Sequence, residues 1–187
     1  DGARRLARET IEAFGRIDLL LCSAGGNSMP KLFHEMAHAE IGEIVAEDLM
    51  GVFHAARAVL PAMMAQKGGA IINVASDAAK VATPGETVIG AVMAAIVMFS
   101  RALAIEAKRS GVRVNCLTPS IVAATPLHDR LMADPFAGRL FGKAKELAHL
   151  GVVEPADIAP LVVFLASPAA ARLTGQAISV NGGISAA

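Results

Sequence analysis

Two patterns of apolar and polar residues alternate along the chain. Four longer segments predict helices: residues 3–14, where charged and apolar residues mix, the long segments 40–64 and 86–110, and residues 155–166, which Pro155 opens. Between them lie short runs that are almost wholly apolar, as in strands buried on both faces of a sheet, at residues 17–22, 70–74, 112–117 and 177–181. Residues 126–149 are mixed in character, and we expect a largely helical excursion there.

Helices that alternate with wholly apolar strands predict an α/β fold, in which a parallel sheet is covered by helices on both faces. The sequence contains no internal repeat, linker or low-complexity tract. A chain of 187 residues with 54% hydrophobic residues is long and apolar enough to fill one core. We therefore expect a single domain over residues 1–187.

The helix expected at 86–110 is unusual because residues 88–99 are apolar on every side. A helix that covers a sheet needs only one apolar stripe, so the opposite face of this helix also needs cover. Small residues at positions 90, 91, 94 and 95 would allow another helix to approach closely. We expect a second subunit to pack here, and the excursion at 126–149 is the alternative cover.

Composition narrows the possible functions. The 17 basic and 17 acidic residues cancel, which argues against a general binder of nucleic acid or of anionic membranes. The longest apolar run, at 88–99, is too short to span a bilayer. Cys22 and Cys116 lie in expected strands without metal-ligand spacing, so we expect two reduced core thiols in a cytoplasmic protein. The sequence has no tyrosine, and a mechanism that needs a phenol cannot run on this chain alone.

Short motifs, in order over nearly the whole chain, carry a resemblance to a known family. They are Ser23-Ala24-Gly25, Leu49-Met50-Gly51, Ile72-Asn73-Val74-Ala75-Ser76, Arg113-Val114-Asn115 before Pro119, and Val180-Asn181-Gly182-Gly183. In these motifs the chain resembles the short-chain dehydrogenase/reductase family, which implies a Rossmann-like fold and nicotinamide-dependent oxidoreductase chemistry. The surroundings of Gly25 and Ser76 resemble hydroxyacyl-CoA dehydrogenases within that family.

The family uses asparagine, serine, tyrosine and lysine as a catalytic set, and the resemblance carries only one of them over. The serine matches Ser76, and the asparagine position holds Asp48. The tyrosine position holds Ile89, and the lysine position, one helical turn further, holds Met93. Loss of a positioned acid alone costs on the order of 10²- to 10⁴-fold in rate. We therefore expect no intact catalytic set, and we expect Ser76 to be a strand-end hydroxyl bonded to backbone.

The cofactor-binding motifs of the family are also depleted. Its asparagine-rich turn reads Ser23-Ala24-Gly25 here, and its Pro-Gly turn reads Pro119-Ser120. No G-x-x-x-G-x-G phosphate loop occurs in the sequence, because the chain begins after that region of the family. We expect the N-terminal βαβ portion, about 60 residues, to be missing or truncated. We expect no cofactor in this chain and NAD in a partner subunit.

A rival motif is His34-Glu35-Met36-Ala37-His38, which fits the H-E-x-x-H pattern of zinc hydrolases. A zinc site of this kind needs both histidines on one helix and a third ligand, for which Glu43 and Glu47 are candidates. The motif falls before the helix expected at 40–64. We therefore expect ordinary surface residues and no metal.

Our main hypothesis is a catalytically inactive subunit that pairs, through helices 40–64 and 86–110, with an active member of the family. The resemblance implies a heterotetramer that oxidises a hydroxyacyl-CoA with NAD, since heteromeric family members with one inactive subunit exist, including one of benzylsuccinate breakdown. The first alternative is a homo-oligomer that uses Asp48, Ser76 or Asp77 in a lyase or isomerase step without nicotinamide. The second alternative is a module that binds an acyl-CoA without turnover.

Overall fold

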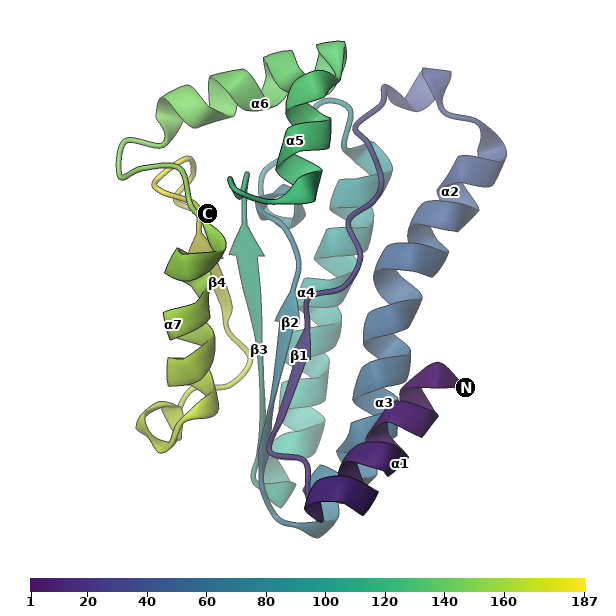
Figure 1. The fold of residues 1–187 in the computed structure, drawn as a ribbon, viewed down its shortest axis with the longest axis vertical. Helices are drawn as coiled ribbons and strands as arrows, with labels where there is room; N and C mark the ends of the chain where they lie inside the picture. Colours follow the sequence, from purple (N-terminus) through teal and green to yellow (C-terminus); the bar gives the residue numbers. More distant parts are fainter.

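Four parallel strands form one sheet in the computed structural model, which describes all residues from 1 to 187. The strands follow the chain in the spatial order β1 (Leu19–Cys22), β2 (Gly69–Val74), β3 (Val112–Pro119) and β4 (Ala177–Val180). Each neighbouring pair is parallel, so every connection crosses over a face of the sheet. The carboxyl ends of all four strands consequently meet at one edge (Figure 1).

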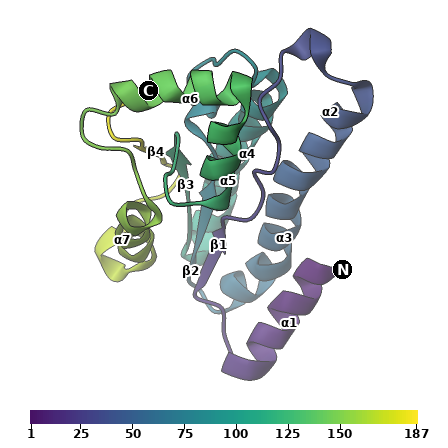
Figure 2. The same ribbon diagram turned by 45° about the horizontal axis from the view of Figure 1, so that its top comes forward.

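Helices cover both faces of this sheet (Figure 1). One face carries α1 (Gly2–Phe14), α3 (Met50–Ala65) and α4 (Thr87–Ala107), and the other carries α7 (Pro155–Ala166). The excursion consists of two helices, α5 (Pro126–Ala133) and α6 (Pro135–Leu147), which lie over the carboxyl end of the sheet (Figure 2). The predicted α/β class, with a parallel sheet between helices, is confirmed.

The helix expected at 40–64 is one continuous helical path with an irregular middle. It begins as α2 (His38–Ile44), passes through a π-helical turn at Val45–Leu49, and continues as α3. Shorter 3₁₀ turns occupy Phe33–Glu35, Asp77–Ala79, Lys108–Ser110 and Pro168–Ala170. A π turn inside an α-helix widens the backbone locally and frequently marks a functional position.

Strand β2 explains why the central strands are apolar at consecutive positions. Ile71 and Ile72 are both fully buried, but they point to opposite faces of the sheet. Ile71 packs with Met63 of α3, whereas Ile72 packs with Leu165 of α7. Because both faces are covered, consecutive positions of the strand are buried, and apolar side chains fill all of them except Asn73, which forms a hydrogen bond to Ser100.

Strand β1 differs from the prediction that residues 17–22 are buried on both faces. Leu19 is 38% exposed and Leu21 is 41% exposed, whereas Leu20 packs against the core. The prediction is wrong because β1 is the edge strand of the sheet: α3 covers one of its faces, but α7 on the other face packs against β2. The strand is also shorter than expected, beginning at Leu19.

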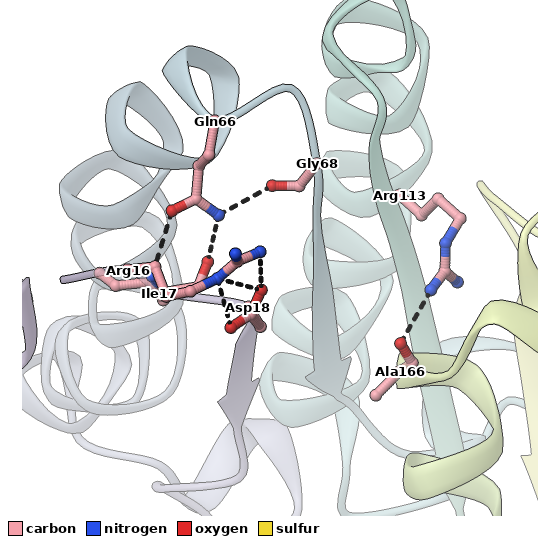
Figure 3. Close-up of polar contacts among 7 residues, drawn as sticks. All are labelled: Arg16, Ile17, Asp18, Gln66, Gly68, Arg113 and Ala166. Carbon is pink, nitrogen blue, oxygen red and sulfur yellow. Dashed lines mark hydrogen bonds and ion pairs between the residues drawn. The ribbon is translucent and has the colours of Figure 1, made fainter. Parts of the chain in front are cut away.

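Side-chain hydrogen bonds join the amino ends of the strands to their neighbours (Figure 3). Gln66, which follows α3, accepts a 3.2 Å hydrogen bond from the Ile17 N–H and donates to the carbonyl groups of Ile17 and Gly68. This side chain therefore ties the loop before β1 to the loop before β2. Arg113 of β3 donates to the carbonyl groups of Leu165 and Ala166 at the end of α7. Partial burial lowers the pKa of Arg113.

Helix α4 packs against the sheet through one face and leaves the other face uncovered. Ala91, Ala94 and Met98 are exposed, and Met98 is 61% exposed. Because α5 and α6 lie over the carboxyl end of the sheet, the excursion does not provide the alternative cover for this face (Figure 2). Gly90, one of the small residues at which another helix was expected to approach, makes a close contact within this chain. A Cβ atom at position 90 would lie 2.9 Å from the Ala78 carbonyl oxygen.

By length and composition alone, the helix at Thr87–Ser110 is long and apolar enough to cross a membrane. The prediction that the run is too short concerned residues 88–99, which form only part of this helix. Half of this apolar stretch is buried inside the fold, as expected for a helix that packs on a sheet.

Candidate functional site at the carboxyl end of the sheet

A cleft of about 710 Å³ opens where the strands end, below α5 and α6. Open α/β sheets bind their ligands at this end. The positions that match the family's catalytic and cofactor-binding residues all line this one cleft, namely Ser23, Ala24, Gly25, Asp48, Ser76, Ile89, Met93, Pro119 and Ser120. The fold therefore brings together residues as distant in the sequence as Ser23 and Ser120.

Asp48 lies in the π-helical turn and is only 3% exposed. Its Oδ1 atom accepts a 2.7 Å hydrogen bond from the Gly26 N–H, and its Oδ2 atom has no partner. Gly25 has a φ of +123°, and a Cβ atom there would lie 3.1 Å from Asp48 Oδ1. Asp48 thus holds the turn after β1 in place, and glycine is needed at the point of closest approach.

Ser76 ends the segment that follows β2 and caps the short turn at Asp77–Ala79. Its Oγ atom accepts a 3.2 Å hydrogen bond from the Ala78 N–H. This geometry agrees with the expected strand-end hydroxyl bonded to backbone. The adjacent Asp77 is 4% exposed, and its Oδ1 atom has no hydrogen-bond partner.

Ile89 and Met93 lie one turn apart on α4 and form part of the wall of the cleft. They are 7% and 8% exposed and belong to an apolar cluster that includes Val92 and Ile96. Lys80 does not replace the missing lysine, because its Nζ atom donates a 2.6 Å hydrogen bond to Ser179 Oγ. No tyrosine, cysteine or lysine lines the cleft.

Sequence analysis missed Glu86, which lines the same cleft at the N-terminal end of α4. Burial raises the pKa of Glu86 to about 7, Thr83 opposes the shift, and the Asp77 carboxylate adds to it. The available signal was its spacing, since Glu86 lies three residues before Ile89 and so on the same side of a helix.

Arg130 and His128 of α5 also line the cleft and were not predicted. Arg130 Nη2 donates a 3.0 Å hydrogen bond to the carbonyl oxygen of Asn27, so it joins α5 to the turn after β1. The Thr125 hydroxyl caps α5 by accepting from the His128 N–H. These contacts close one side of the cleft.

The lining residues do not fit the ribose-binding chemistry that the family resemblance implies for nicotinamide. A phenol and an amine are needed beside the ribose, and Ile89 and Met93 offer neither group. In the turn after β1, the Gly26 N–H already donates to Asp48.

The H-E-x-x-H motif does not lie on one helix. His34 is in the short 3₁₀ turn at Phe33–Glu35, whereas His38 is the first residue of α2. No group of three or more His, Cys, Asp or Glu side chains is placed to hold a metal ion. Cys22 and Cys116 are both buried and free, and burial raises the pKa of each thiol to about 11.

Comparison with known proteins gives consistent matches over nearly the whole chain. Residues 1–185 match the family described as enoyl-(acyl carrier protein) reductase. The chain is 34% identical to a 3-oxoacyl-[acyl-carrier-protein] reductase of Synechocystis, over 98% of this chain and 71% of that protein. It is 36% identical to the (2S)-[(R)-hydroxy(phenyl)methyl]succinyl-CoA dehydrogenase subunit BbsD of Thauera aromatica, over 95% of this chain and 69% of that protein.

Solved structures share the fold. A short-chain dehydrogenase/reductase from Brucella melitensis superposes with a TM-score of 0.85 at 33% identity, covering 100% of this chain and 73% of that one. ElxO with NADP bound superposes with a TM-score of 0.84, covering 97% of this chain and 73% of that one. At 20% identity the second likeness concerns the fold alone.

Proposed function

This chain belongs to the short-chain dehydrogenase/reductase family, and we propose that it serves there as a catalytically inactive subunit. In this proposal it assembles with an active member of the family, which binds NAD and oxidises a hydroxyacyl-CoA. Two free, buried thiols fit a reducing compartment, so we place the complex in the cytoplasm.

One observation carries the proposal: the tyrosine and lysine positions of the family hold Ile89 and Met93, and both side chains pack into an apolar cluster. An apolar side chain cannot transfer a proton, and members of a catalytic set that act as a unit do not retain proportional activity when the others are lost. The hydroxyl group of Ser76, the one member of the set that remains, accepts a hydrogen bond from the backbone N–H of Ala78.

The uncovered face of α4 supports assembly with a partner. Met98 and Ile105 are 61% and 62% exposed on this helix, and a pair of aromatic rings, Phe53 and Phe99, joins α4 to α3 at a centroid distance of 4.5 Å. When a second subunit covers apolar surface of this kind, removing the surface from water stabilises the assembly. A relative of this chain, BbsD, is itself named as a subunit of a CoA-thioester dehydrogenase.

Native mass spectrometry of the complex isolated from its own host tests the proposal. We expect a second chain of the family, in equal ratio, that carries tyrosine and lysine at the positions matching 89 and 93. Replacing that tyrosine by phenylalanine should abolish acetoacetyl-CoA reduction by the complex, whereas Ser76→Ala in this chain should leave the turnover unchanged. A homo-oligomer of this chain alone, or a partner that is equally stable and active without it, would refute the proposal.

A further inference from the structure

Glu86 is the one carboxylic acid on the wall that α4 presents to the cleft. Glu86, Ile89, Met93 and Ile96 follow one another at intervals of three, four and three residues, and all four line the cleft. This spacing is that of one stripe of an α-helix. The other three residues of the stripe are apolar, so Glu86 is the only group there that can exchange a proton with a ligand.

The surroundings of Glu86 favour an uncharged carboxyl group. Its side chain is partly buried at the wall of the cleft, and the buried Asp77 carboxylate is its charged neighbour in the turn packed against α4. The other titratable groups that line the cleft are Asp48, His128 and Arg130, and Lys80 of the turn packed against α4 is held by Ser179. Burial and the neighbouring anion both penalise the carboxylate form.

We propose that Glu86 is a ligand-binding residue whose carboxylic acid group donates a hydrogen bond to the carbonyl oxygen of an acyl thioester in the cleft. The ligand class rests on the proposed function, whereas the role of Glu86 rests on the cleft of this chain. The apolar stripe beside Glu86 accommodates the acyl group, since Ile89, Met93 and Ile96 offer only hydrocarbon and thioether surface. A protonated carboxyl group is both uncharged and a donor, which suits a carbonyl acceptor in such surroundings.

Binding of this kind depends on pH. With a pKa of about 7, Glu86 is mostly protonated at pH 6 and mostly ionised at pH 8. Only the protonated form can donate, so the dissociation constant should rise about tenfold between these two pH values. In Glu86→Gln the amide group remains a donor without a charge, and the affinity should no longer follow this titration.

The experiment is calorimetric titration of acetoacetyl-CoA into the full-length protein, in the assembly in which it is isolated, at pH 6 and pH 8. Wild type, Glu86→Gln and Glu106→Gln are compared; Glu106 is an exposed residue of the same helix and serves as the matched control. We expect the tenfold loss at pH 8 in the wild type and in Glu106→Gln, and near-equal affinities at both pH values in Glu86→Gln.

Three outcomes overturn the inference. Identical isotherms for wild type and Glu86→Gln at both pH values would show that Glu86 does not contact the ligand. A tenfold pH dependence that persists in Glu86→Gln would assign it to His128 or another group. An affinity that rises with pH would mean that a carboxylate binds a cationic or donor group. Because only this chain carries the substitution, each result is read independently of whether native mass spectrometry finds an active partner.

Discussion

A buried hydrogen bond between β2 and α4 offers the sharpest test of how this fold holds its cleft. Asn73 of β2 is fully buried, and its Nδ2 atom donates a 2.8 Å hydrogen bond to Ser100 Oγ. The Ser100 hydroxyl in turn donates to the Ile96 carbonyl oxygen. Asn73 Oδ1 has no partner, so Ser100 is the only hydrogen-bonding partner of this side-chain amide. The substitution Ser100→Ala leaves the whole amide buried and unpaired.

The size of the effect follows from this geometry. An unpaired polar group inside a protein costs about 1–3 kcal/mol, and the methyl group of alanine fills nearly the same space as the serine side chain. For a chain of this length each kcal/mol lowers the melting temperature by about 2–4 °C. We expect Ser100→Ala to lower the free energy of unfolding by about 2 kcal/mol and the melting temperature by about 4–8 °C.

The double variant Asn73→Val with Ser100→Ala provides the control. Valine removes the unpaired amide and suits a buried strand, so the double variant should be more stable than Ser100→Ala alone. Urea unfolding followed by circular dichroism is the suitable assay, because the chain has no tryptophan or tyrosine for intrinsic fluorescence. A wild-type midpoint for Ser100→Ala, or a double variant that is less stable still, would refute the reasoning.

Three further predictions concern single residues. Gly90→Ala should destabilise the protein by about 1 kcal/mol or more, because the new Cβ atom would lie 2.9 Å from the Ala78 carbonyl oxygen. Gly51→Ala should stabilise the protein by up to about 1 kcal/mol, because no atom lies within 4 Å of the new Cβ atom. Urea midpoints of the two variants that move in the same direction would contradict this prediction. Cys22 and Cys116 should resist a thiol-specific disulfide reagent at pH 8 and react only in urea, because burial raises the pKa of each to about 11; rapid labelling of the native protein would count against it. Since burial raises the pKa of Glu86 from its ordinary 4.5 to about 7, the folded state binds more protons than the unfolded state in that range. The free energy of unfolding should therefore fall as pH rises from 4.5 to 7, and less so in Glu86→Gln.

The pattern of apolar residues predicted the order of the four strands and of the long helices between them, because a parallel sheet covered on both faces imposes continuous apolar strands. It could not predict the exposure of Leu19 and Leu21, since a run of leucines looks the same in a central strand and in an edge strand. Nor did it locate the π-helical turn at Val45–Leu49. Asp48 of that turn accepts a hydrogen bond from the Gly26 N–H, a contact between distant residues that a local pattern does not show.

The candidate site was partly predictable for a similar reason. Residues that match a family motif, such as Ser76 and Ile89, could be placed in advance, and the structure brings them to one cleft. Arg130 could not, because its position in the cleft follows from how α5 meets the sheet, and for Glu86 the sequence offered only its helical spacing from Ile89. The raised pKa of Glu86 depends on burial and on Asp77, and neither is visible in a linear sequence.

Helix α7 is held very differently at its two ends. At its C-terminal end, the Arg113 guanidinium group of β3 binds the last carbonyl groups of the helix. At its N-terminal end, Pro155, Ile158 and Ala159 face the cleft. The helix that lines the cleft with its first residues is thus anchored through its last residues to Arg113, which lies at the amino end of β3, and between its two ends Leu165 packs against Ile72 of the sheet. Strand β3 therefore serves both ends of the site, because its last residue, Pro119, lines the cleft while its second residue, Arg113, holds the far end of the helix beside it.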